Sequence, residues 1–126
     1  MFAIAIWDCR TEELILARDR VGIRPLFWTR TADRFAFASE VKALATLPDV
    51  RLRLDQHALL QSFRFWTCTG DTSPFKDVHQ LPAAHYAVVT DDAVRLERYW
   101  QWPLPGDLAP LELSSDAEYC EAFVAE

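Results

Sequence analysis

The chain has 126 residues, of which 51% are hydrophobic, so it is long enough for one domain with an apolar core and is not of the disordered class. A net charge of −6 disfavours a nucleic-acid partner, and the spread of its 13 basic residues along the chain disfavours a membrane-binding patch. No apolar run is nearly long enough for a membrane-spanning helix. Its three cysteines stand at no metal-ligand spacing, so we expect no metal site, and free thiols favour a cytoplasmic location.

Strands are predicted in the first part of the chain. The apolar run Phe2–Trp7 is typical of a buried strand, and Glu13–Arg18 predicts the returning strand. Leu26–Thr29 and Phe35–Ala38 predict a hairpin, because the polar residues 30–34 between them have turn chemistry.

Two helices are predicted next. Ser39 has the chemistry of an N-cap, with Glu40 in the first turn of a helix that continues to Leu47. Asp55 is the expected cap of a second helix, Gln56–Phe65. Apolar residues of this second helix fall on one face at helical spacing: Leu59, Leu60 and Phe63.

The last part of the chain is predicted to contain a loop, a hairpin, a linker and a final helix. Residues 66–74 predict a loop, and Tyr86–Thr90 with Val94–Trp100 predict a late hairpin. Residues 101–113 are rich in proline and predict a linker. A final helix is expected over 114–126, and its apolar pattern is still running at the last residue, so we expect a fragment.

The loop between the second and third predicted strands is unusually charged. It reads Ala-Arg-Asp-Arg-Val-Gly-Ile-Arg-Pro-Leu-Phe. Gly22 can adopt positive φ at no steric cost, and Pro25 fixes φ near −65°. This pattern indicates a loop of defined shape rather than an ordinary turn.

The same loop carries a resemblance to a known family. Arg-Asp-x-x-Gly-x-Arg-Pro-Leu, followed by Phe-Ala-Ser-Glu-Val-Lys-Ala-Leu at 37–44, resembles the class II (N-terminal nucleophile) glutamine amidotransferase domain. Its first half is shared with the amidophosphoribosyltransferases. Phe-Lys-Asp-Val at 75–78 and Arg-Tyr-Trp at 98–100 are closer to the glutamine-hydrolysing asparagine synthetases. The resemblance runs from Met1 to about Trp100.

The pattern of strands and short helices predicts an α+β fold. The resemblance implies part of an Ntn-hydrolase-type α/β/β/α sandwich of antiparallel sheets, the C-terminal part of that domain, with its N-terminal strands missing. Residues 1–100 would be a partial glutaminase domain, 101–113 the linker, and 114–126 the start of a truncated helix leading to an absent synthetase domain. Where the related pattern usually has Pro-Gly, this chain has Ala83-Ala84, which narrows the conformations open to that turn.

The candidate residues of a substrate pocket or interdomain loop are Arg18, Asp19, Gly22, Arg24, Pro25, Ser39 and Glu40. The resemblance implies that the first five lie near the glutaminase pocket or the ammonia route. The alternative, which we favour, is that the charges form an internal ion pair that fixes the loop. For the last two residues the helix-cap interpretation is stronger.

No catalytic residue is expected in this chain. The family it resembles hydrolyses glutamine with an N-terminal Cys whose own α-amine is the base, since that amine titrates near working pH. Here Phe2 follows Met1, and the nitrogens of Cys9, Cys68 and Cys120 lie in peptide bonds. No ATP-binding motif is present, so the chain itself is expected to hold no cofactor, and the family's ATP and Mg²⁺ would belong to the absent synthetase domain.

We therefore expect a fragment of an asparagine-synthetase-type enzyme, inactive alone, from the domain that releases ammonia from glutamine for ATP-dependent amidation of aspartate. Expected partners are glutamine, the missing N-terminal half-domain, the synthetase domain and a second copy of the chain through open sheet edges. Three alternatives stay open. The first is a sister enzyme such as a β-lactam synthetase or lasso-peptide cyclase, and the second, which the residues at 98–100 disfavour, is an amidophosphoribosyltransferase. The third is a non-catalytic binding or assembly module.

Overall fold

The computed structural model describes residues 1–104, 115, 117 and 118. Within them, one antiparallel sheet has the strand order β1-β2-β6-β7, and a second has the order β4-β3-β5. The first sheet consists of β1 (Ala3–Asp8), β2 (Glu13–Arg18), β6 (His85–Val89) and β7 (Val94–Arg98). The second consists of β3 (Phe27–Arg30), β4 (Phe35–Ala38) and β5 (Val78–Gln80). The described helices are α1 (Val41–Leu44) and α2 (Gln56–Phe65).

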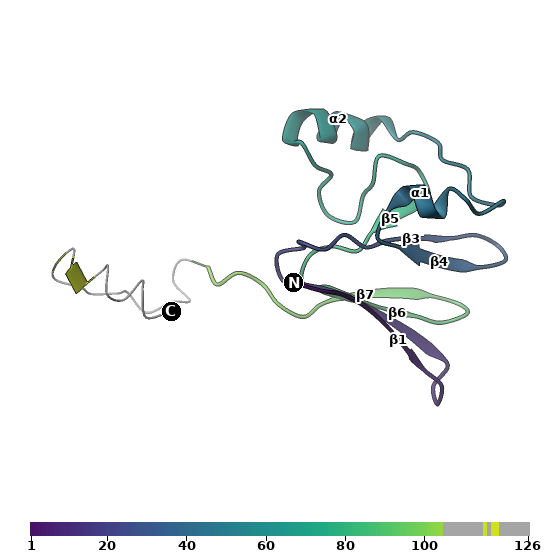
Figure 1. The fold of residues 1–126 in the computed structure, drawn as a ribbon, viewed down its shortest axis with the longest axis horizontal. Coiled ribbons are helices and arrows are strands. Elements are labelled where there is room, and N and C mark those ends of the chain that lie inside the picture. The colour runs from purple at the N-terminus through teal and green to yellow at the C-terminus, as the bar shows by residue number, and fades with distance from the viewer. Residues whose placement is uncertain (105–114, 116, 119–126) are drawn as a thin grey trace.

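The two sheets lie in adjacent layers, and both helices lie beyond the second sheet (Figure 1). The core fills the space between the sheets, because alternate residues of each strand point to the same face. Its buried members are Leu16, Ala87 and Val89 of the first sheet and Leu26, Trp28 and Leu81 beside or within the second. The predicted α+β class with antiparallel sheets is confirmed.

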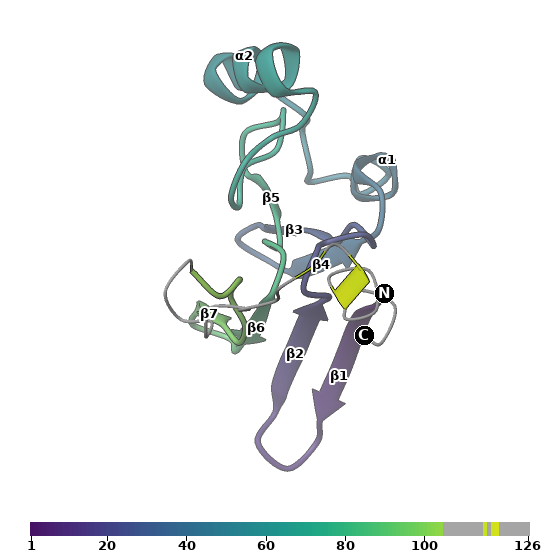
Figure 2. The same cartoon turned by 90° about the vertical axis from the view of Figure 1, so that its left-hand side faces the viewer.

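Strand β1 is present as predicted, but it is not buried. It forms the edge of the first sheet (Figure 2), where Ile4, Ile6 and Trp7 remain 41%, 53% and 57% exposed. Ile6 pairs with Ile15 of β2, on the face turned away from the core. A continuous apolar run indicates a strand but does not distinguish a central position from an edge, so the prediction of burial was wrong.

The helix expected after Ser39 is shorter and differently capped. Helix α1 ends at Leu44 rather than Leu47, and its N-cap residue is Glu40, without a side-chain capping bond. The Glu40 carboxylate instead pairs with the Lys42 ammonium. The prediction of Ser39 as the cap was therefore wrong. With four residues and one buried side chain, Leu44, this helix depends on tertiary packing rather than on local signals.

Helix α2 has the predicted bounds and cap. The Asp55 carboxylate accepts hydrogen bonds from the backbone N–H of His57 (2.9 Å) and Ala58 (3.1 Å). Its buried residue is Ala58, whereas Leu60 and Phe63 are 66% and 77% exposed, so much of the apolar side of the helix faces outward. None of the described helices is long and apolar enough to cross a membrane.

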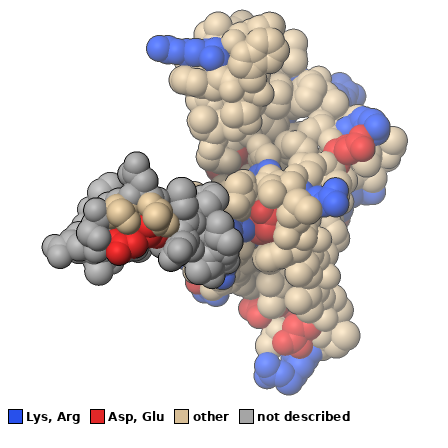
Figure 3. Space-filling model, turned by 60° about the vertical axis from the view of Figure 1, so that its left-hand side comes forward, with Lys and Arg blue, Asp and Glu red and all other residues tan. Residues whose placement is uncertain are grey.

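The two predicted hairpins are confirmed as β3–β4 and β6–β7. Strand β5 was not predicted, because three residues are too short to show a period; it is recognised only by its pairing with β3. The predicted linker lies largely, and the final helix almost wholly, outside the described residues. Charged side chains on the face shown in Figure 3 stand in small separate groups on a largely uncharged surface.

The turn before β6 departs from ordinary L-residue geometry. Ala84 is buried and has φ +59°, in the left-handed region. Its N–H donates to the Asp19 carbonyl (3.0 Å), and its carbonyl accepts from the Tyr99 N–H (2.9 Å). These two bonds hold an alanine where glycine is intrinsically preferred.

We predict that Ala84→Gly stabilises the chain by about 0.5–1 kcal/mol, because relief of the left-handed strain outweighs the greater freedom of glycine in the unfolded state. The matched control is Ala87→Gly, at a fully buried position of the regular strand β6. That change should destabilise by about 1 kcal/mol or more. Urea denaturation measures both, and a loss of stability in Ala84→Gly would contradict the prediction.

Candidate functional site

The charged loop predicted from sequence connects the two sheets. We call residues 18–26 the crossing loop, because it runs from the end of β2 in the first sheet to the start of β3 in the second (Figure 1). Two of its charged side chains, Arg18 and Asp19, are only 8% and 5% exposed. Burial of two charges is costly unless their polar atoms are satisfied, so their partners decide what the loop does.

The Asp19 carboxylate is surrounded by backbone N–H donors. Its Oδ1 accepts from Val21 (3.2 Å), Gly22 (2.9 Å) and Ile23 (3.2 Å). Its Oδ2 accepts from Arg24 (3.1 Å) and from Phe2 (3.3 Å). One carboxylate thus folds the loop around itself and ties it to the chain just before β1.

The Arg18 guanidinium makes the complementary set of contacts with backbone carbonyls. Nε donates to the Arg24 carbonyl (2.8 Å), Nη2 to that of Gly22 (2.6 Å) and Nη1 to that of Leu81 (2.7 Å). In the amide orientation that satisfies both groups, Gln80 Oε1 also accepts from Nη1 and Nη2 at 2.8 and 3.1 Å. The planar fork of arginine matches this arrangement, which a lysine could not reproduce.

The loop is also joined to the end of the first sheet. The Tyr99 hydroxyl donates to the Arg18 carbonyl (2.8 Å), and the Asp19 N–H donates to the Phe2 carbonyl (3.0 Å). The charges of Arg18 and Asp19 therefore stabilise the loop internally, as the favoured interpretation proposed, but through backbone groups rather than through an ion pair with each other.

The electrostatics of the two groups follow from this geometry. Burial acts to raise the pKa of Asp19, but the N–H donors of Arg24, Ile23, Phe2 and Val21 outweigh it and hold that pKa well below its usual range. Burial lowers the pKa of Arg18, and the nearby Asp19 carboxylate opposes that effect. Asp19 is therefore ionised at neutral pH and does not act as a general acid or base there.

Gly22 occupies a position that requires glycine. Its φ is +73°, and a Cβ built there would lie 3.0 Å from the Ala83 Cβ and 3.1 Å from the Arg18 Cζ. The loop backbone therefore passes too close to its neighbours for a side chain. Pro25 follows at the exposed end of the loop, and the Arg24 side chain is also exposed.

A shallow hollow of about 430 Å³ lies beside the crossing loop. Its lining includes Met1, Phe2, Arg20, Val21, Ile23 and Tyr99 as well as Asp19. Val21 and Ile23 are 60% and 55% exposed, so this side of the loop is largely apolar. Ser39 and Glu40 do not line the hollow; they follow β4, whose last residue, Ala38, pairs with Phe27 directly after the crossing loop. The Arg20 guanidinium lies over the Trp100 ring, 5.6 Å from its centroid, a contact that no local sequence pattern predicts.

The described thiols lie away from this loop. Cys9 is exposed in the turn after β1, and Cys68 is half-buried after α2. Cys68 Sγ lies 3.0 Å from the Ser62 hydroxyl and 3.5 Å from the Ala58 carbonyl, contacts of an ordinary packed cysteine. Among the described residues no group of three His, Cys, Asp or Glu could hold a metal ion.

Comparison with known proteins adds the family. A model of the glutamine amidotransferase domain matches residues 1–100. The chain is 36% identical over 101 residues to the glutamine-hydrolyzing asparagine synthetase 3 of Bacillus subtilis, covering 79% of this chain and 16% of that protein. It is 34% identical over 110 residues to asparagine synthetase 2 of the same bacterium, covering 79% and 14%. It is 31% identical over 129 residues to the amidase chyE of Penicillium rubens, covering 98% and 17%.

Two glycines of positive φ allow a matched test of the crossing loop. Gly70 has φ +68° with no atom within 4 Å of a built Cβ, whereas Gly22 meets Ala83 and Arg18. Gly70→Ala should cost only the left-handed penalty, about 1 kcal/mol, and Gly22→Ala about 2–3 kcal/mol, because its neighbours must also shift. Urea denaturation of both variants checks this. Equal costs would contradict the close packing described here.

The pH dependence of stability tests the Asp19 contacts. Because its pKa is lowered in the folded state, Asp19 should stabilise the fold above about pH 4, its unfolded value, and lose that contribution as the pH falls further. Asp19→Asn should therefore be less stable than wild type at pH 7, and the difference should shrink below pH 4. Urea midpoints from pH 7 to 2 measure it. Asp33→Asn, which removes a carboxylate from an exposed position, is the matched variant for comparison.

Proposed function

The chain belongs to the glutamine amidotransferase domain family, and from this premise we propose that residues 1–100 are the glutaminase-domain scaffold of an asparagine-synthetase-type protein. In such a protein, ammonia released from glutamine supplies an ATP-dependent amidation of aspartate to asparagine. The chain spans 14–17% of the length of the curated relatives named above, so the amidation chemistry, with its ATP and Mg²⁺, would reside in sequence outside this chain.

The crossing loop is the observation that carries this proposal. The family signature begins with Arg18 and Asp19, and both side chains are buried against backbone groups. The signature therefore encodes a loop shape, which presents Val21 and Ile23 beside the chain start at Phe2. A scaffold role explains why two charges are buried against backbone groups of the same chain.

The proposed role in catalysis is indirect. A cysteine nucleophile requires a base within hydrogen-bond reach, and in this family the base is the nucleophile's own free amine. Cys9, Cys68 and Cys120 all have their nitrogens in peptide bonds. The described part of this chain would thus position a glutaminase pocket whose reacting groups come from elsewhere in the protein.

The finer fold proposal is the four-layer Ntn-type sandwich. Two packed sheets with helices beyond the second sheet support this proposal, because they would form three of those layers (Figure 1). The outer face of the first sheet carries Ile4 and Ile6, which are 41% and 53% exposed. A second helical layer would cover these side chains, since a contiguous apolar sheet face normally packs against another element.

A second candidate is a sister enzyme that uses the same scaffold for a different acceptor. The match to the amidase chyE covers 98% of this chain, whereas the matches to the two Bacillus asparagine synthetases each cover 79%. Replacing the acceptor would leave the internal contacts of the crossing loop unchanged, because Arg18 and Asp19 bind backbone groups of the scaffold. The two candidates therefore differ in the synthetase partner and not in the residues described here.

We predict that the purified chain alone releases no ammonia from glutamine above a control whose thiols have been alkylated. A coupled glutamate dehydrogenase assay measures this. In a chimera, the segment that precedes the matched region in the Bacillus subtilis asparagine synthetase 3 is joined to Met1, and thiol-dependent ammonia release should appear. Glutaminase activity of the unmodified chain would contradict the proposal, and a folded chimera without activity would contradict the scaffold role.

A further inference from the structure

A second concave surface lies away from the crossing loop. We call it the basic hollow. It has a volume of about 390 Å³ and forms where the end of β3, the segment between α1 and α2, and the turn before β5 meet. Four cationic residues contribute to its lining: Arg30, Arg51, Arg53 and Lys76. Nothing in the glutaminase-domain proposal uses this surface.

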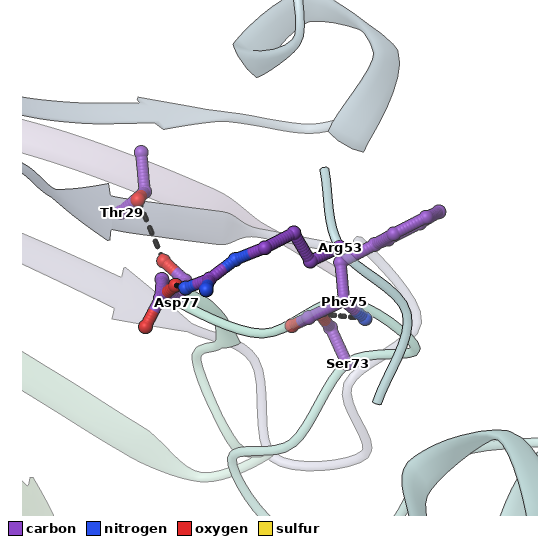
Figure 4. Close-up of polar contacts among 5 residues, drawn as sticks. All are labelled: Thr29, Arg53, Ser73, Phe75 and Asp77. Carbon is purple, nitrogen blue, oxygen red and sulfur yellow. Dashed lines mark hydrogen bonds and ion pairs between the residues drawn. The ribbon is translucent and has the colours of Figure 1, made fainter. Parts of the chain in front are cut away.

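The two carboxylates of the basic hollow already have partners. Asp49 Oδ2 accepts from the Thr31 hydroxyl (2.7 Å) and lies 3.1 Å from Arg34 Nε. These contacts hold the pKa of Asp49 below its ordinary value, the Thr31 bond most of all, so it is ionised at neutral pH. Asp77 Oδ2 pairs with Arg53 Nη2 at 2.6 Å (Figure 4).

Three of the cations lack a carboxylate partner among the described residues, although Arg30 donates through Nη2 to the backbone carbonyls of Thr90 and Asp91. Arg51 and Lys76 are exposed, and within the described residues neither has a carboxylate within ion-pair distance. Lys76 acts on Asp55 only through space, as one cause of that residue's lowered pKa. Four cations and two carboxylates leave the lining with a net positive charge. All 13 basic residues precede residue 104, whereas six of the 19 acidic residues follow it. The residues before 104 therefore carry no net charge as a whole, and the basic hollow is a positive region within them.

The walls of the basic hollow are fixed by hydrogen bonds between segments distant in sequence. The Thr29 hydroxyl donates to the Asp77 carbonyl (2.6 Å; Figure 4), and the Lys76 N–H donates to the Arg53 carbonyl (2.8 Å). The buried Ser73 hydroxyl donates to the Val78 carbonyl (2.6 Å) and closes the adjoining turn. The backbone segments that carry the cations are therefore held in place before a ligand binds, which lowers the entropic cost of ordering the cations around it.

We propose that the basic hollow binds a small phosphate-bearing anion. Arg51 and Lys76 supply exposed charges that no carboxylate of the described residues neutralises, and Arg53, held by Asp77, adds a guanidinium beside them. Arginine presents a planar fork of donors that matches phosphate oxygens, and lysine adds a point charge. The available volume fits a small phosphorylated molecule rather than a macromolecular surface, and the concave positive lining concentrates such anions.

The test is calorimetric titration of the full chain with inorganic pyrophosphate and with glycerol phosphate, at constant ionic strength. Saturable binding of one anion per chain is expected. The variant Arg51→Gln/Lys76→Gln should weaken binding by about tenfold or more, since two charge-assisted contacts are lost. The matched control is Arg10→Gln/Arg95→Gln, which removes the same charge from residues paired with Asp8 and Glu97 and should bind as wild type does.

Three results would overturn the proposal: no saturable binding to either phosphate compound, equal weakening in both double variants, or binding of citrate as tight as that of pyrophosphate. Circular dichroism checks that each variant folds. If the Arg51→Gln/Lys76→Gln variant does not fold, amide chemical shifts of the wild-type chain decide instead. Shifts on titration should centre on residues 49–53 and 76–78, and shifts centred elsewhere would reject the site.

Discussion

One buried carboxylate organises the joining of the two sheets. Asp19 accepts five backbone N–H groups, four from its own loop and one from Phe2, while the neighbouring Arg18 binds carbonyls as far away in sequence as Leu81. A buried charge without such partners would raise the free energy of the fold. The loop therefore has one low-energy shape, the one that supplies these partners. That shape sets how β2 of the first sheet leads into β3 of the second, and the shared apolar core follows from it.

The family signature can be understood in these terms. The resemblance implied that its charged residues lie near the glutaminase pocket, whereas the two most buried ones bind backbone groups, and the glycine is required by close approach to Ala83. The exposed apolar side of the loop, with Val21 and Ile23, is then the part available to other segments of a longer protein. In this view the signature specifies a support for chemistry, and the chemistry itself is supplied by groups outside the loop.

The surface exposes large apolar side chains, as expected of a part that contacts more protein. Ile6 on the sheet edge, Phe63 on α2 and Trp66 at its end are 53%, 77% and 95% exposed, more apolar exposure than an isolated domain usually tolerates. The relatives are several times longer than this chain, and they contain the sequence that could cover such faces. The basic hollow differs from these faces, because its walls are tied by hydrogen bonds within the described chain and its unpaired charges favour a small anion.

The sequence alone determined what depends on neighbouring residues. Alternation and apolar runs located six of the described strands, Asp55 marked the start of α2, and the Arg-Asp-x-x-Gly pattern identified the family, because each is a local signal. Only the tertiary structure decided that β1 is an edge, that Ser39 caps nothing, and that the three residues of β5 form a strand. The partners of Arg18 and the walls of the basic hollow could likewise not be predicted from neighbouring residues. Those features depend on contacts between residues tens of positions apart. Such contacts form when the elements pack together, and they produce no periodic pattern in the sequence.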